Sequence, residues 1–319
     1  MKSSSPPRPK KWGRHDRRGW DGPGAGGMKN LRRRGQEFFL TLPSFFWLSL
    51  FFLIPTALVF ILAFRPADPF GGIGRGWTTA TIKGLADPQY LAIAWRTLWV
   101  SFLSTAFCLL LAVPTAYAVA RAPERRRNLL LMLVIVPFWT SFLIRVFAWK
   151  SILHPEGLIK KTLVFCGLVD PSSQLLYNLG AVILVTVYTF LPFAILPIYA
   201  AAEKFDYRLL EAARDLGARP FQAFRKVFLP GIRQALVTAV LVVFIPSLGS
   251  YIVPDIVGGP GSEMLGNKIA QRVFVDRNLP LAGGLSIVLI LAVLAPLLGV
   301  LALQGKKARI QPPEGGGKP

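Results

Sequence analysis

The sequence has few of the residues that catalytic and metal sites require. Only 17% of its 319 residues are charged, and it has two histidines and two cysteines. Cys108 and Cys166 lie far apart and form no Cys-x-x-Cys pair, so they indicate neither a zinc site nor a redox pair. His15 and His154 belong to no His-Glu-x-x-His motif. We therefore predict no catalytic residue, no metal and no cofactor.

Motifs for nucleotide hydrolysis and acyl transfer are also absent. The chain has no Gly-x-x-x-x-Gly-Lys-Ser/Thr sequence, which is the loop that cradles the phosphates of ATP. It has no Gly-x-Ser-x-Gly sequence either, and its long apolar runs contain no paired carboxylates. The chain is therefore not expected to be an enzyme, and any ATP hydrolysis that it depends on must belong to another chain.

Apolar residues are abundant instead. They make up 53% of the chain, and the mean hydropathy is +0.47. A run of about 18 to 20 apolar residues is long enough to cross a bilayer as a helix. Six such runs occur, at residues 44–64, 97–120, 129–149, 179–199, 235–253 and 281–303. The predicted fold class is all-α, a polytopic protein with six transmembrane helices surrounded by membrane lipid.

The two ends of the chain differ from the apolar part. Residues 1–36 are rich in proline, glycine, lysine and arginine, a composition that predicts a disordered tail. Residues 37–305 form the predicted membrane domain, and residues 306–319 form a second tail. Met28 begins a short basic leader of its own, so translation from Met28 is an alternative to translation from Met1.

Positive charges gather in particular segments. Both tails are basic, and so is the loop after the fourth run, between Lys204 and Lys226. The loop after the second run contains four arginines, Arg121, Arg125, Arg126 and Arg127. Because cytoplasmic segments carry an excess of lysine and arginine, these loops and both termini are predicted to lie in the cytoplasm. This orientation accounts for the net charge of +21 without nucleic acid as a partner.

The loop at residues 205–230 contains the charged sequence EAARDLGARPFQAFRKVFLP. Asp206 is placed to cap a short helix that Gly217 ends, and Pro220 is placed to start a second one. The pattern predicts two amphipathic helices at a glycine elbow. Apolar side chains are expected to face a partner, namely Leu209, Leu210, Phe221 and Phe224. The alternative is an interfacial helix that lies on the lipid surface.

The spacing of residues in this loop resembles a family motif. The matching positions are Glu211, Ala212, Ala213, Gly217, Val227, Leu229 and Pro230. They resemble the EAA loop of binding-protein-dependent ABC transporter permeases, and the one departure is Val227, where the family has isoleucine. The resemblance implies that these residues form a coupling helix, which docks in a groove of a cytoplasmic ATPase.

Further stretches, at residues 137–149, 244–260 and 275–289, resemble the spermidine/putrescine branch of these permeases. The similarity covers about residues 40–305. It implies the type I ABC importer permease fold and a location in the bacterial inner membrane. The implied partners are a dimer of an ABC ATPase, a second similar permease and a periplasmic or surface binding protein. The implied cargo is a polyamine or a related small cationic or organic solute.

Six residues are candidates for the translocation path: Arg145, Trp149, Pro246, Gly249, Tyr251 and Asp255. Pro246 and Gly249 interrupt the fifth run, which frees carbonyl groups for a cation. Trp149 and Tyr251 offer aromatic faces to an ammonium group, and packing or anchoring at the interface is the alternative role.

The charged candidates have alternatives too. Asp255 offers a carboxylate to a cation. Arg145 is costly if it faces lipid. It therefore faces the pore, pairs with an acid such as Asp255, or extends to the lipid headgroups.

Two rival functions follow from the sequence. A secondary transporter or channel driven by an ion gradient needs no ATPase, but it predicts acidic residues within the spans and an inverted repeat. The six runs contain almost no acidic residues. A passive membrane scaffold leaves the spacing of the EAA residues unexplained.

Overall fold

The computed structural model describes residues 25–68 and 71–308, and side chains within residues 41–299. Every regular element in these residues is a helix, apart from one isolated antiparallel bridge between Ala67 and Ile73. The chain divides into two units, residues 1–57 and residues 58–319.

The described part of the first unit is helical throughout. Helix α1 is Ala25–Ala63 and continues into the second unit. Residues 25–36 were expected to be disordered and are helical instead, whereas residues 1–24 lie outside the described part. Leucine, lysine and arginine are good helix formers, and neither glycine nor proline occurs between Met28 and Arg34.

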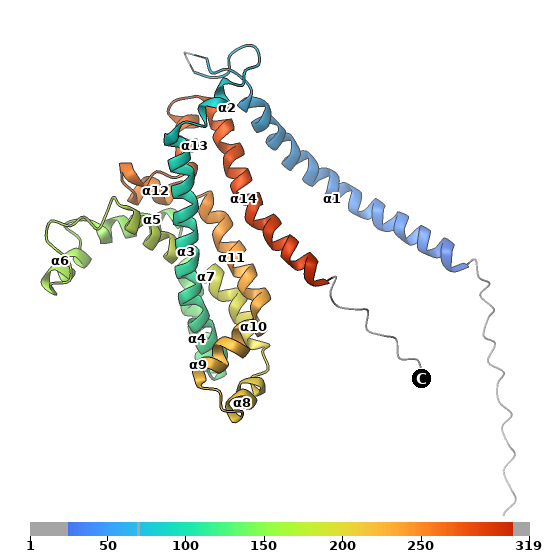
Figure 1. The fold of residues 1–319 in the computed structure, drawn as a ribbon, viewed down its shortest axis with the longest axis vertical. Coiled ribbons are helices and arrows are strands. Elements are labelled where there is room, and N and C mark those ends of the chain that lie inside the picture. Colours follow the sequence, from blue (N-terminus) through green and yellow to red (C-terminus); the bar gives the residue numbers. More distant parts are fainter. Residues whose placement is uncertain (1–24, 69–70, 309–319) are drawn as a thin grey trace, which may run out of the picture. The chain divides into compact units, whose positions relative to one another are not determined.

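The second unit is built around three long helices. Helices α3 (Pro88–Arg121), α7 (Leu179–Glu203) and α11 (Arg233–Leu248) lie side by side (Figure 1). Helix α14 (Leu279–Ala308) packs against α11 and against α13. The shorter helices are α2 (Ala80–Gly84), α4 (Glu124–Ile135), η1 (Val136–Trp139), α5 (Phe142–Leu153), α6 (Leu158–Phe165), α12 (Ile252–Val257), η3 (Pro260–Ser262) and α13 (Leu265–Phe274).

Within the described part of the chain, four helical segments are long and apolar enough to cross a membrane. They are Thr41–Ala63, Pro88–Arg121, Leu179–Glu203 and Leu279–Gly299. Two further helix pairs pass the same criterion together but are bent, by 94° and 73°. The described helices therefore provide four to six candidate spans, and the predicted third and fifth spans overlap the two bent pairs.

The third predicted span, at residues 129–149, is not one straight helix. The chain bends by 94° between Trp139 and Phe142. Thr140 has an extended backbone with ψ 151°, and its hydroxyl donates a hydrogen bond to the Pro137 carbonyl at 2.6 Å. This carbonyl belongs to the last turn before the bend, where helix ends leave carbonyl groups without intrahelical partners.

The fifth span, predicted at residues 235–253, also differs. Helix α11 ends at Leu248 with Gly249 as its C-cap, and α12 follows after Tyr251. Before α11 the chain bends by 73° from the preceding segment, Pro220–Gly231. Pro246 lies inside α11 and does not end it.

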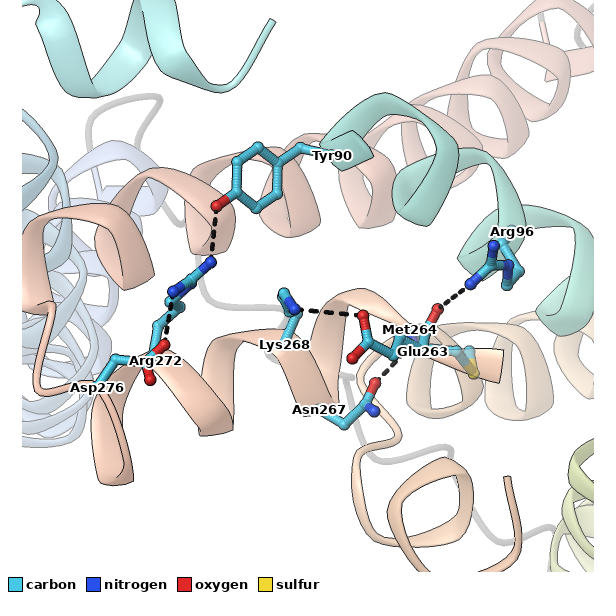
Figure 2. A network of polar contacts seen from close by, with 8 residues as sticks. All are labelled: Tyr90, Arg96, Glu263, Met264, Asn267, Lys268, Arg272 and Asp276. Atoms are coloured by element: carbon cyan, nitrogen blue, oxygen red, sulfur yellow. Dashed lines mark hydrogen bonds and ion pairs between the residues drawn. The ribbon is translucent and has the colours of Figure 1, made fainter. Parts of the chain in front are cut away.

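A network of polar contacts holds α13 against α3, as Figure 2 shows. Arg96 donates a hydrogen bond to the carbonyl of Glu263 at 3.4 Å, and Lys268 forms an ion pair with the carboxylate of Glu263 at 3.2 Å. Arg272 donates a hydrogen bond to the hydroxyl of Tyr90 at 3.0 Å. The segment after α12 is therefore fixed to the start of α3.

Backbone atoms approach closely at the same place. The amide of Leu265 donates a hydrogen bond to the Thr97 hydroxyl at 2.8 Å. A Cβ atom on Gly266 would lie 2.5 Å from the carbonyl oxygen of Ser250 and 2.9 Å from that of Gly249. Only glycine fits here without displacing the backbone of the break between α11 and α12.

We expect Gly266→Ala to destabilise the protein, because the new methyl group meets backbone oxygens that cannot rotate away. Overpacking of this kind typically costs about 1–3 kcal/mol. The matched control is Gly261→Ala, where an added Cβ meets no atom within 4 Å. Thermal unfolding in detergent, followed by tryptophan fluorescence, measures both. Equal unfolding temperatures for the two variants would contradict the close approach.

Candidate functional site

The loop that carries the EAA residues lies at one end of the α3–α7–α11 bundle, and α2 and α13 lie at the other end (Figure 1). It contains α8 (Arg208–Asp215), α9 (Pro220–Ala223), the π-helix η2 (Phe224–Phe228) and α10 (Leu229–Gly231). Two short helical segments are therefore joined at an elbow, as the sequence predicts.

The elbow is a well-formed helix C-terminus. Gly217 has a φ angle of +86°, and its amide donates to the Arg214 carbonyl at 2.9 Å. The Ala218 amide donates to the Ala213 carbonyl at 3.0 Å. This pair of hydrogen bonds is the Schellman motif, which satisfies the last carbonyl groups of a helix and favours glycine at the residue with positive φ. The glycine therefore fixes the direction in which the chain leaves α8.

The second segment of the loop is also stabilised locally. Pro220 is at the first position of α9, and the Arg219 amide donates to the side-chain oxygen of Gln222 at 3.1 Å. The π-helix then carries the chain into α10, with the Leu229 amide donating to the Phe224 carbonyl. A π-helical turn has one more residue than an α-helical turn, and it often occurs at functional sites.

The predicted coupling residues divide into two groups. Glu211, Ala212, Gly217 and Pro230 are exposed. The other three, Ala213, Val227 and Leu229, are half-buried and pack against the core at this end of the bundle. The first group is accessible to a partner, and the second group holds the loop in place.

The apolar surface of the loop differs in part from the prediction. Leu209 and Phe221 are 52% and 71% exposed. Leu210 is buried and Phe224 is half-buried, so these two residues face the core and not a partner. The sequence prediction missed Leu216, which is 90% exposed. Its position, seven residues after Leu209 and four after Ala212, places it on the same helix face as both, and this spacing is the signal that could have identified it.

The inner side of the loop is aromatic. The ring of Tyr117, from α3, lies 4.9 Å from the ring of Phe228 and 5.2 Å from that of Phe224. Burial raises the pKa of Tyr207, the nearby Tyr117 oxygen adds to this effect, and Arg121 opposes it. Tyr207 therefore keeps its proton at neutral pH and donates it to the Ala202 carbonyl at 2.9 Å.

Arg145, a candidate for the path, lies on α5 without an ion pair in the described part of the chain. Its guanidinium carbon lies 4.3 Å from the centre of the Phe138 ring. Its Nε and Nη1 atoms are buried and have no hydrogen-bond partner. The pairing with Asp255, one of the three alternatives for Arg145, is therefore not present, and the guanidinium group makes a cation–π contact instead.

The other candidates lie on neighbouring helices. Trp149, on α5, is half-buried, and its ring centre is 5.3 Å from that of Tyr188 on α7. The remaining candidates, Pro246, Gly249, Tyr251 and Asp255, are all exposed along the break between α11 and α12. Because α12 packs against α5, the structure brings the two groups onto adjacent helices.

We expect Gly217→Ala to loosen the elbow, because a side chain is unfavourable at a φ angle of +86°. The cost of about 1–2 kcal/mol predicts that amide hydrogen exchange in residues 208–223 becomes roughly fivefold faster or more. Gly84→Ala, at the end of α2, is the control, because Gly84 has open space and no positive φ angle. Unchanged exchange in the elbow of Gly217→Ala would contradict this reading of the motif.

Comparison with known proteins gives consistent matches. Residues 102–306 match the family described as binding-protein-dependent transport system inner membrane component. The spermidine/putrescine transport system permease protein PotB of Haemophilus influenzae is 37% identical over 260 residues, which cover 82% of this chain and 91% of that protein. PotB of Escherichia coli strain K12 is 34% identical over 243 residues, which cover 76% and 88% of the two chains.

A solved structure shows the same fold. The crystal structure of a bacterial ABC transporter that imports the acidic polysaccharide alginate contains a chain with a TM-score of 0.63 and 18% identity. The match covers 90% of this chain and all of that chain. The predicted all-α fold of type I ABC importer permeases is confirmed, and the relatives are transport subunits. This multi-pass membrane protein belongs to the family of binding-protein-dependent transport system inner membrane components.

Proposed function

We propose that this chain is the permease subunit of an ATP-driven importer of polyamines. The observation that carries the proposal is the EAA loop, which combines the family spacing with an exposed apolar face. Leu216, at the end of α8, and Phe221, in α9, are 90% and 71% exposed. Exposed apolar side chains on a rigid elbow are typical of a docking surface for another protein.

The exposed surface of the loop favours an ATPase partner, and the family supports the other proposed partners. A dimer of an ABC ATPase binds the exposed coupling residues, while Ala213, Val227 and Leu229 hold the loop against the spans. A second, similar permease completes the pore, and a binding protein delivers the solute on the opposite side. One of the solved alginate transporter structures contains a periplasmic protein bound to alginate pentasaccharide, which supports such an arrangement.

The proposed orientation puts the loop and both termini in the cytoplasm. The supporting observation is the positive charge at the loop end of the bundle, where Arg125 and Arg126 are exposed at the start of α4. Nearby, Arg127 forms an ion pair with Glu203 at 3.0 Å, which joins the start of α4 to the end of α7. ATP binding closes the ATPase dimer and moves the loop. This movement changes the pore from inward-facing to outward-facing.

The proposed cargo is spermidine or putrescine, as the names of the relatives indicate. A polyamine carries several ammonium groups, which carboxylates and aromatic faces attract. Tyr251 and Asp255 are exposed at the break between α11 and α12 and offer both kinds of group. Pro246, Gly249 and Trp149 shape the same region. Arg145 repels a cation, so we assign it a structural or gating role.

We expect Leu216→Asp to remove the ATPase from the complex, because the substitution places a charge in the apolar docking surface. Loss of a central contact of about 2 kcal/mol weakens binding roughly 30-fold. Co-purification from native membranes in mild detergent measures the effect. The control is Leu168→Asp, which changes another exposed leucine in the loop between α6 and α7.

The control variant should retain the ATPase at the wild-type level. If wild-type protein brings down no ATPase, under conditions that preserve other ABC transporters, the proposed function is wrong. If both aspartate variants retain the ATPase, the docking surface lies elsewhere on the chain.

Asp255→Asn should slow polyamine uptake, because the side chain loses its charge with little change in shape. The attraction between opposite charges 4 Å apart in water is about 1 kcal/mol, which predicts a decrease of roughly fivefold. Asp170→Asn, in the exposed segment before α7, is the control. The measurement is radiolabelled spermidine uptake into proteoliposomes with saturating binding protein. Equal rates for the two variants would exclude Asp255 from the path.

A further inference from the structure

Helix α3 is not adjacent in sequence to the EAA loop. The loop continues directly from α7 and leads directly into α11, so movement of the loop reaches these two helices through the backbone. Helix α3 ends at Arg121, and its chain continues into α4. Any direct transmission from the loop to α3 must therefore go through side chains.

Five rings fill the space between the loop and α3. We name them the aromatic cluster: Tyr117, Phe205, Tyr207, Phe224 and Phe228. Tyr117 is the member from α3, and the other four belong to the loop. The ring centre of Tyr117 is 4.9 Å from that of Phe228, 5.2 Å from that of Phe224 and 6.1 Å from that of Tyr207. One residue of α3 is therefore in contact with the N-cap residue of α8 and with two residues of η2.

The loop rings also contact one another, so they form one packed unit. Phe205 lies 5.2 Å from Phe228 and 5.5 Å from Tyr207, and Phe224 stacks on Phe228 at 5.1 Å. Phe228 is completely buried. Such interiors are close-packed, so a ring cannot shift without displacing its neighbours.

Arg121 fixes the position of Tyr117 from the cytoplasmic end of α3. Its Nη1 atom donates a hydrogen bond to the Tyr117 hydroxyl at 2.9 Å. The guanidinium group also lies over the Tyr117 ring at 5.5 Å and over the Tyr207 ring at 5.7 Å. Because it contacts rings from α3 and from the loop, Arg121 adds an electrostatic link to the packing contact.

We infer that Tyr117 is a positioning residue that transmits the movement of the EAA loop to α3. The inference rests on the proposed function, in which the ATPase moves this loop. The ring of Tyr117 lies against Tyr207, which precedes α8, and against Phe224 and Phe228 of η2. A displacement of the loop therefore pushes directly on α3. A smaller, flexible side chain at position 117 would leave space that absorbs this displacement.

The opposing explanation is that α3 follows α7 and α11 without help from Tyr117. Helix α3 packs against both helices along the bundle, so they provide an indirect route. The two routes predict different results for a variant that shortens the Tyr117 side chain but leaves the packing among α3, α7 and α11 intact.

The test compares Tyr117→Leu, Tyr117→Phe and Tyr199→Leu in the complete transporter, with its ATPase and loaded binding protein, in proteoliposomes. Spermidine uptake and ATP hydrolysis are measured on the same sample. We expect Tyr117→Leu to retain the ATPase and hydrolyse ATP, while uptake per ATP falls at least threefold. Tyr117→Phe keeps the ring contacts and loses only the hydrogen bond from Arg121, so its uptake per ATP should stay closer to wild type than that of Tyr117→Leu. Tyr199→Leu is the control, because Tyr199 is a half-buried tyrosine of α7 outside the aromatic cluster.

A second variant tests the same contact from the loop side. Phe224→Leu removes the ring that meets Tyr117 edge to face, and it preserves the test if the Tyr117→Leu protein does not fold. We expect it to lower uptake per ATP as well. Combining Phe224→Leu with Tyr117→Leu should lower uptake no further than the stronger single variant, because both remove one shared contact.

Three results would overturn the inference. They are unchanged uptake per ATP in both single variants, loss of the ATPase from the Tyr117→Leu complex, and fully additive effects in the double variant. The first favours the indirect route, and the second shows that Tyr117 only maintains the shape of the docking surface. A wild-type complex without an ATPase would instead overturn the proposed function, so the two failures are distinguishable.

Discussion

The structure depends on the requirement that backbone polar groups in a membrane find partners within the protein. Long helices meet this requirement, and the described residues form almost no other regular structure. Where a span breaks, backbone groups lose their intrahelical partners and need others. At the break after Trp139 the Thr140 hydroxyl donates a hydrogen bond to the Pro137 carbonyl, and beside the break between α11 and α12 the Thr97 hydroxyl accepts a hydrogen bond from the amide of Leu265. The breaks are therefore built features of the fold, and the candidate path residues lie beside them.

Outside the spans the EAA loop solves a different problem. In the proposed function it presents an apolar surface to the ATPase and remains attached to the bundle. The Schellman elbow at Gly217 turns Leu216 outward, and the aromatic cluster holds the opposite face against α3. Docking and transmission thus use the two faces of one short segment. This division explains why the loop contains both exposed leucine and buried phenylalanine.

Much of this arrangement could be predicted from the sequence, because hydropathy and family spacing are local signals. The approximate locations of the four long spans and the glycine elbow follow from them. The 94° bend after Trp139 could not be predicted, because Pro137 resembles the prolines that other spans tolerate. The inward orientation of Leu210 and Phe224 also escaped prediction, since it depends on packing against distant parts of the chain, such as Tyr117 in the case of Phe224. Likewise, the lack of an ion partner for Arg145 is a property of tertiary packing, which residue type does not reveal.

The central claim is that ATP hydrolysis by a partner chain drives polyamine movement through this subunit. The most direct measurement is radiolabelled spermidine uptake by cells or vesicles in which ATP and the ion gradients are removed separately. We predict that uptake stops when ATP is depleted and continues when a protonophore collapses the gradient with ATP present. Uptake that survives ATP depletion and stops with the protonophore would contradict the account, and it would identify a gradient-driven carrier.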